Sequence, residues 1–185
     1  FLHLRFTHLI RDAFLNAIEI RPGTPKRLRP IRILTSDSAY LDRAGNLWEA
    51  DRYFDGGQLV SRPRPVSGAA DPALYRSQRC GHITYAIPVA PGGTYSMTLR
   101  FAEGWHGTGK PVAGGVGSRQ FNLFCNAQTL ALNFDIYKEA GGAERAVERT
   151  FHGLRPSPQG KLVLYLQPVV GYACVNAIEV SDEGK

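Results

Sequence analysis

The sequence predicts an all-β protein, an antiparallel β-sandwich or jelly roll, and three observations support that fold class. Short runs of alternating apolar and polar residues recur along the chain. Stretches rich in Gly and Pro, which form turns, separate these runs. No stretch of ten or more residues shows the 3.6-residue period of an amphipathic helix. Several short strands within about 150 residues favour two packed antiparallel sheets.

The individual strands follow from the alternation. Residues 95–101 place Tyr95, Met97, Leu99 and Phe101 on one face, and residues 120–125 turn Phe121, Leu123 and Cys125 inward. Further strands are predicted at 84–89, 130–137, 161–168 and 173–180, with turns at 90–93, 107–118, 139–144 and 155–160. Residues 143–149 are at most one or two helical turns.

One short motif occurs twice. Residues 15–20 read LNAIEI and residues 175–180 read VNAIEV, and seven of the first twenty residues recur at this offset. Because the offset is the size of a domain, we interpret 1–20 as the last two strands of a preceding copy. Residues 21–30 are then a basic, proline-rich linker, and 31–182 a complete domain. The alternative is that 1–20 is the first hairpin of a single domain. An isolated hairpin is marginal in water, so either interpretation requires 1–20 to pack against the complete domain.

Charge and composition restrict the partners. The net charge of +6 comes partly from residues 21–32, but no aromatic side chain lies there to stack on a base, so nucleic acid is not expected. No apolar run is long enough to cross a bilayer. Neither the three cysteines nor the five histidines have the close spacing of metal ligands, so no metal or cofactor is expected. Buried free thiols are the default for Cys125 and Cys174, and a Cys125–Cys174 disulfide is the alternative in an exported protein.

Aromatic residues outside the predicted strand interiors are the best candidates for a ligand site. We place Tyr40, Tyr53, Trp105 and His106 at the surface and assign Trp48 and Tyr85 to the core. Trp105 and His106 begin a long glycine-rich segment between two strands, and such loops are uncommon unless functional. An aromatic ring covers the apolar face of a sugar while carboxylates bond its hydroxyls. Asp42 and Asp51, near Tyr40 and Tyr53 in the chain, are the carboxylates we expect to do so.

Several longer segments together resemble the malectin domain. They include GNLWEAD (45–51), DPALY (71–75), LRFAE (99–103), NFDI (133–136) and NAIE (176–179). The resemblance covers about 150 residues. It implies a lectin-like β-sandwich without catalytic activity that binds glucose oligosaccharides through loop aromatics. Such modules are found in an endoplasmic reticulum lectin, in plant receptor kinases and in bacterial multidomain proteins, often as tandem copies.

The resemblance also implies positions for the sugar site. The family's sugar-binding aromatics correspond to Tyr40, Tyr53 and the Trp105–His106 pair, where the family usually has two aromatics. The family's binding acid falls near Gly171–Tyr172, where this chain has no acid. Residues 32–37 also lack the family's N-A-G-G.

The sequence therefore predicts a carbohydrate-binding module, from a bacterial tandem array and in an extracytoplasmic location. The expected partners are a glucan-type oligosaccharide and a neighbouring malectin-like domain. The predicted binding residues are Tyr40, Tyr53, Trp105, His106, Asp42 and Asp51. Two alternatives stay open: a structural or protein-interaction sandwich without sugar binding, and, less favoured, a glycoside-processing enzyme whose carboxylates flank a glycosidic bond.

Overall fold

A computed structural model describes residues 29–62, 64–108 and 114–184. The predicted unit 1–20 and nearly all of the 21–30 linker lie outside the described residues. The strands are β1 (Ile31–Leu34), β2 (Tyr40–Leu41), β3 (Leu47–Trp48), β4 (Phe54–Ser61), β5 (Ser77–Pro88), β6 (Thr94–Ala102), β7 (Gln120–Cys125), β8 (Gln128–Phe134), β9 (Ala146–Leu154), β10 (Lys161–Val170), β11 (Ala173–Val175) and β12 (Ala177–Gly184). A 3-10 turn, η1 (Pro72–Tyr75), and a short helix, α1 (Ile136–Ala140), complete the elements.

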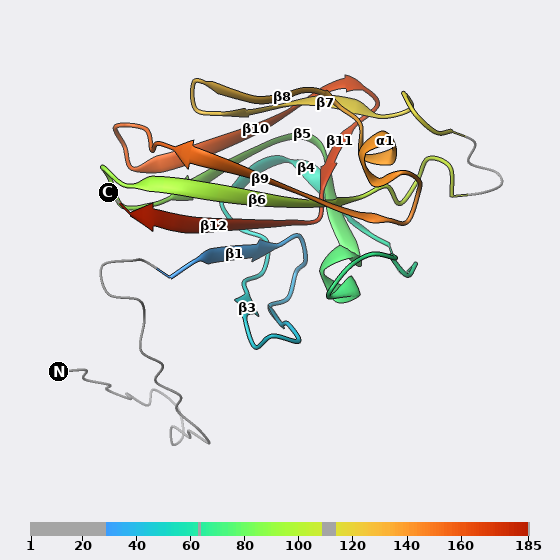
Figure 1. Cartoon of the computed structure of the whole chain (residues 1–185), viewed down its shortest axis with the longest axis horizontal. Coiled ribbons are helices and arrows are strands. Elements are labelled where there is room, and N and C mark those ends of the chain that lie inside the picture. Colours follow the sequence, from blue (N-terminus) through green and yellow to red (C-terminus); the bar gives the residue numbers. More distant parts are fainter. Residues whose placement is uncertain (1–28, 63, 109–113, 185) are drawn as a thin grey trace.

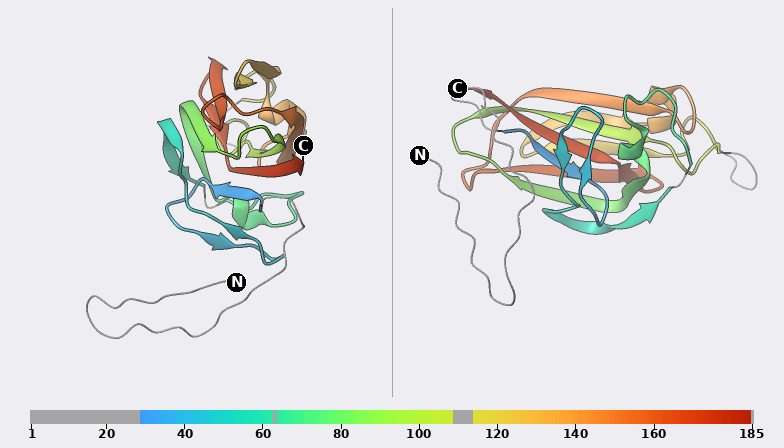
Figure 2. Two further views of the ribbon diagram at one scale, coloured as in Figure 1. Left: turned by 90° about the vertical axis from the view of Figure 1, so that its left-hand side faces the viewer. Right: turned by 90° about the horizontal axis from the view of Figure 1, so that it is seen from below.

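The strands form two layers, which confirms the predicted sandwich (Figure 1). One sheet has the order β1-β12-β6-β9. In the other, β5 pairs with β11, β10 and β4, and the sheet continues through β7 to β8. All pairings between these named strands are antiparallel. The small β2–β3 hairpin lies across β12 in the right-hand view of Figure 2.

The core between the sheets comes from the predicted alternation. The four inward residues of 95–101 are all buried, as are Phe121, Leu123 and Cys125. Phe101, Phe121 and Phe134 form a cluster of tilted and edge-to-face rings, with centroids 4.9–6.0 Å apart. Trp48 and Tyr85 are buried, as predicted.

The predicted strand 173–180 is two strands in two different sheets. Residue Asn176 separates β11, which pairs with β5, from β12, which pairs with β6 and β1. Its buried side-chain amide donates to the carbonyls of Tyr75 and Ser77 and accepts from the Ala102 N–H. The amide therefore satisfies backbone groups from both layers where the chain crosses between them.

Two further expectations were wrong in detail. Residues 146–154 form β9, paired along β6, where the sequence suggested helical turns over 143–149. The predicted strand 130–137 ends at Phe134, because Asp135 accepts from the Lys138 N–H and caps α1. Gly141, with φ of 70°, ends that helix in the left-handed conformation.

The cysteine pairing differs from both expectations for Cys174. Cys174 forms a disulfide with Cys80, its direct partner across β11 and β5. Cys125 is a buried free thiol, as expected by default, and burial raises its pKa to about 11. The sequence did not indicate the Cys80 pairing because cross-strand partners are set by register, not by chain distance.

The described part of the chain contains no helix long and apolar enough to cross a membrane.

Candidate functional site

The structure places the six predicted binding residues in three separate places. Tyr40 and Asp42 lie on the β2–β3 hairpin, and Asp51 and Tyr53 precede β4. Trp105 and His106 follow β6. The eight residues of β4 separate Tyr53 from Arg62, whose guanidinium lies 4.8 Å from the Trp105 ring centre. A strand of that length spans roughly 25 Å, so Tyr53 and Trp105 do not form one pocket.

Asp51 and Tyr53 lie in the segment that leads into β4, and side chains of β5 hold this segment in place. The Asp51 carboxylate is buried, pairs with Arg79 at 2.7 Å and accepts from the Tyr85 hydroxyl at 2.8 Å. Burial raises the pKa of Asp51, and the hydrogen bonds from Arg79 and Tyr85 only partly offset this effect. Tyr53 has a φ of 63°, and Arg52 stacks on its ring. Both carboxylate oxygens of Asp51 already have partners, so this carboxylate is engaged within the protein.

Asp42 organises the β2–β3 hairpin. It accepts from the backbone N–H groups of Ala44 and Asn46 and from the Trp48 indole N–H at 2.9 Å. Burial opposes its ionisation, but these bonds outweigh burial and keep the pKa of Asp42 below its usual value. The Tyr40 hydroxyl donates to Asp71 at 3.0 Å. Tyr40 and Asp42 thus lie together on the hairpin, where their polar atoms bond to groups of the hairpin and of η1.

Trp105 is the exposed aromatic among the predicted residues, with 46% of its surface accessible. It lies in the segment after β6, at the right-hand end of the sandwich in Figure 1. Arg62 packs against its ring in a cation–π contact. His106 is half-buried beside it. An indole held at the surface by a rigid support is suited to stack on a flat apolar ligand face.

A buried ion pair fixes this segment from below. Glu103 Oε1 accepts from the backbone N–H groups of Trp105 at 2.8 Å and His106 at 3.0 Å. Arg119 Nε donates to Glu103 Oε2 at 2.6 Å, and both side chains are almost fully buried. Arg119 Nη1 also donates to the Tyr172 carbonyl. One carboxylate and one guanidinium therefore position three surface residues, Trp105, His106 and Tyr172.

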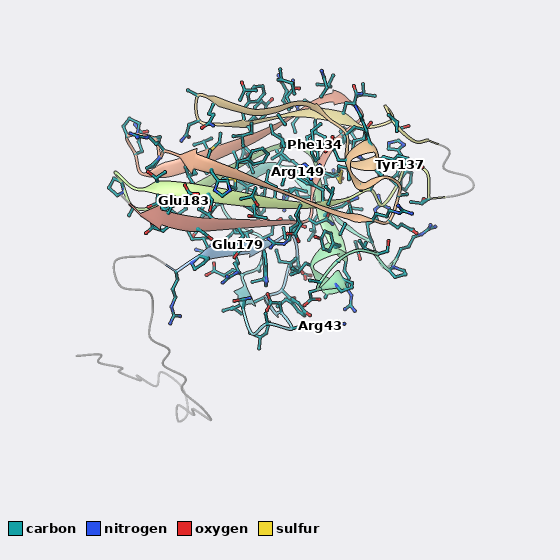
Figure 3. All side chains as sticks on the ribbon, viewed as in Figure 1. Arg43, Phe134, Tyr137, Arg149, Glu179 and Glu183 are labelled. Carbon is teal, nitrogen blue, oxygen red and sulfur yellow. A yellow bond between two sulfur atoms is a disulfide. The ribbon has the colours of Figure 1, made fainter. Side chains whose placement is uncertain are left out.

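Tyr172 is a candidate that the residue pattern did not identify. Its side chain is 65% exposed, and it precedes β11, next to the disulfide at Cys174. The only sequence signal was its place, since Gly171–Tyr172 is where the family's binding acid falls. Tyr137 of α1, labelled in Figure 3, lies at the same end, where its ring packs closely against Gly107. We call Trp105, His106, Tyr137 and Tyr172 the aromatic end.

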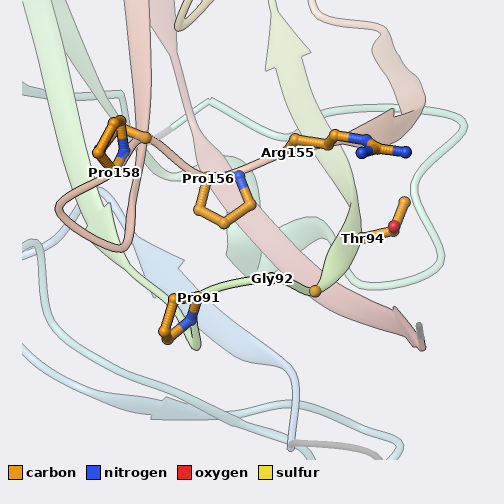
Figure 4. A pocket seen from close by; sticks show the side chains of 8 residues that line it. Pro91, Gly92, Thr94, Arg155, Pro156 and Pro158 are labelled. Atoms are coloured by element: carbon orange, nitrogen blue, oxygen red, sulfur yellow. The ribbon is translucent and has the colours of Figure 1, made fainter.

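A cleft at the other end of the sandwich contains none of the predicted residues. It has a volume of about 450 Å³ between the 91–94 and 155–158 turns (Figure 4). Pro91, Pro156, Pro158 and Arg155 line it, and it has no aromatic ring and no carboxylate. Among the described residues, no group of three or more His, Cys, Asp and Glu side chains is placed to hold a metal ion.

The profile of the malectin domain family matches residues 31–177. The chain belongs to the malectin domain family. The resemblance drawn from the sequence is thereby confirmed, and this malectin domain accounts for most of the chain.

The regions of similar sequence in the relatives are parts of longer proteins. This malectin domain is 27% identical over 161 residues to Receptor-like protein 4 of Arabidopsis thaliana, covering 76% of this chain and 25% of that protein. It is 28% identical over 129 residues to Kinesin-like protein KIN-14E of Oryza sativa subsp. japonica, covering 58% of this chain and 12% of that protein. The chain thus spans a quarter or less of either relative.

Solved structures share the fold. The ANXUR2 extracellular domain of Arabidopsis thaliana matches with a TM-score of 0.70 at 19% identity, over 84% of this chain and 42% of that one. A Bacteroides uniformis beta-glucuronidase matches with a TM-score of 0.67 at 15% identity, over 83% of this chain and 18% of that one. At these identities the likeness concerns the fold alone.

Proposed function

We propose that this malectin domain is a non-catalytic carbohydrate-binding module whose site is the aromatic end. The observation that supports it most is the anchoring of exposed Trp105 by the buried Glu103–Arg119 pair. Burying two charges is costly, and exposing an indole leaves apolar surface in water. Here the buried ion pair lies directly beneath the exposed indole, so the indole is already positioned for a partner. This pre-positioning lowers the entropy lost on binding.

The polar groups around Trp105 suit the rim of a sugar. The half-buried imidazole of His106 and the exposed hydroxyl of Tyr172 can donate or accept hydrogen bonds. The indole offers an apolar plane for the C–H face of a pyranose, as in most small-ligand sites with few placed polar groups. Of the six predicted binding residues, the proposed site therefore keeps Trp105 and His106. It adds the other two members of the aromatic end, Tyr137 and Tyr172.

The Cys80–Cys174 disulfide supports an extracytoplasmic location in this proposal. Disulfides persist mainly in oxidising compartments such as the periplasm and the cell exterior. The bond joins β5 to β11 directly beside Tyr172.

Calorimetric titration with maltotriose and other glucan trisaccharides tests the site. We expect Trp105→Ala to weaken binding at least about tenfold, because a central aromatic contact usually exceeds 1.4 kcal/mol. Leu132→Ala is the matched control, since Leu132 is 63% exposed on β8 and lies outside the aromatic end.

Three outcomes decide the proposal. Equal glucan affinity of the Trp105→Ala variant and the wild type would show that the site lies elsewhere. No binding of any glucan by the wild type would favour the alternative, a protein-interaction module. Turnover of an oligosaccharide that is lost in Asp42→Asn or Asp51→Asn would favour a glycoside-processing enzyme.

A further inference from the structure

A second hollow lies on the outer face of the four-stranded sheet, between that face, the β2–β3 hairpin and η1. Its volume is about 170 Å³, and none of its lining residues belongs to the aromatic end. Neighbouring strands form its floor with one charged residue each: Arg32 on β1, Glu179 on β12, Arg100 on β6 and Glu148 on β9. We call this hollow the outer groove.

The floor of the outer groove is a row of alternating charges. Arg32 Nε lies 2.8 Å from Glu179 Oε1, and Arg100 Nη2 lies 3.1 Å from Glu179 Oε2. Arg100 Nε lies 3.1 Å from Glu148 Oε1. The remaining nitrogen, Arg100 Nη1, is buried and has no hydrogen-bond partner within the described residues. The Arg100 guanidinium also lies over the Trp48 ring, 4.8 Å from its centre, so the Trp48 indole lies directly against this row of charges.

The roof of the outer groove adds further charges of both signs. Asp42 and Arg43 come from the hairpin, and Asp71 caps η1 (Arg43 and Glu179 are labelled in Figure 3). Asp71 accepts from the Tyr40 hydroxyl and from the Arg43 backbone N–H. The groove therefore contains three arginines and four carboxylates. An anion would meet the carboxylates and a cation would meet the guanidinium groups, so neither is favoured.

We propose that the outer groove binds one ring of a neutral, polyhydroxylated compound, such as a single pyranose unit. A hydroxyl group carries one donor and two acceptor lone pairs, so it can accept from a guanidinium and donate to a neighbouring carboxylate. The volume has room for about six waters at about 30 Å³ each, which suits one ring and not an oligosaccharide. This mode of binding, through hydrogen bonds to charged side chains, thus differs from the aromatic stacking proposed at Trp105.

The chain contains only two tryptophans, and each reports one site. Trp48 lines the outer groove, and Trp105 lies at the aromatic end. The indole N–H signals of the two residues in a ¹⁵N NMR spectrum therefore follow the two sites separately, with Trp105→Phe assigning the peaks. The probes are methyl α-D-glucopyranoside, glucuronate and glucosamine, which share the ring but differ in charge.

We expect the glucopyranoside to shift the Trp48 signal saturably, and glucuronate and glucosamine to bind about tenfold more weakly or not at all. Ala70→Phe, which fills the groove from an exposed position without removing a charge, should abolish the Trp48 response and leave Trp105 unaffected. If the Trp48 signal never shifts, or shifts equally for all three probes, the proposal that the outer groove binds a neutral ring is wrong. If the Trp105 signal does not shift on addition of maltotriose, the result instead contradicts the proposed function.

Discussion

At the residue scale, the buried Glu103–Arg119 ion pair positions residues that lie at the surface. Glu103, the last residue of the LRFAE run, directly follows β6 and is buried, where it pairs with Arg119, the residue before β7. Its carboxylate holds the backbone of Trp105 and His106, and its partner holds the carbonyl of Tyr172. Because a buried ion pair gives little net stability over apolar residues of the same size, its value here lies in positioning.

Glu103→Ala should lower the free energy of unfolding by about 3–5 kcal/mol, because it leaves the Arg119 guanidinium buried without a counter-charge. Urea denaturation measures the change. Arg64→Ala is the control: the Arg64–Glu144 pair lies at the surface, so its loss should cost less than about 1 kcal/mol. A similar small cost for both variants would show that water reaches Arg119.

At the element scale, Asn176 decides where one strand becomes two. The six consecutive residues from Ala173 to Ile178 are all buried, which a single alternating strand with one face toward solvent would not allow. Thr35 also donates its hydroxyl to the Asn176 carbonyl at 2.8 Å. The side chain and backbone of this residue together join β1, β6 and the segment from η1 to β5.

Asn176→Ala should therefore lower the free energy of unfolding by about 2–4 kcal/mol, because the Ala102 N–H and two carbonyls lose their buried partner. Thermal and urea unfolding followed by circular dichroism measure this loss. Gln128→Ala, at an exposed position on β8, should change stability by less than about 0.5 kcal/mol. If Asn176→Ala were equally mild, the crossover would not depend on the amide.

At the scale of the whole molecule, each residue of the second copy of the repeated motif has a structural role. In residues 176–179, Asn176 bridges the layers, Ala177 and Ile178 are buried in the core, and Glu179 pairs with two arginines. Residues 16–19 carry the same four letters. We therefore propose that 1–20 is the corresponding end of a preceding copy of this domain, which keeps a neighbouring malectin domain among the proposed partners.

Deleting residues 1–20 should lower the melting temperature, because the alternating apolar residues of this segment need a surface to pack against. Differential scanning calorimetry of the whole chain and the shortened chain measures the change. A chain carrying the same twenty residues in scrambled order controls for length and composition. An unchanged melting temperature on deletion, with the scrambled chain also unchanged, would show that the segment contributes nothing to this domain.

The sequence by itself determined the sandwich, the family and most of the core, because period-two alternation is a local property that needs no partner strand. It also separated buried Trp48 and Tyr85 from exposed Trp105. Only the tertiary structure decided that Cys80 pairs with Cys174, that Asn176 divides a strand, and that β4 separates Tyr53 from Trp105. Those outcomes depend on which strands meet and in which register. Residues close in the chain can therefore bond to different elements, as Asp42 does within its own hairpin and Asp51 does with β5.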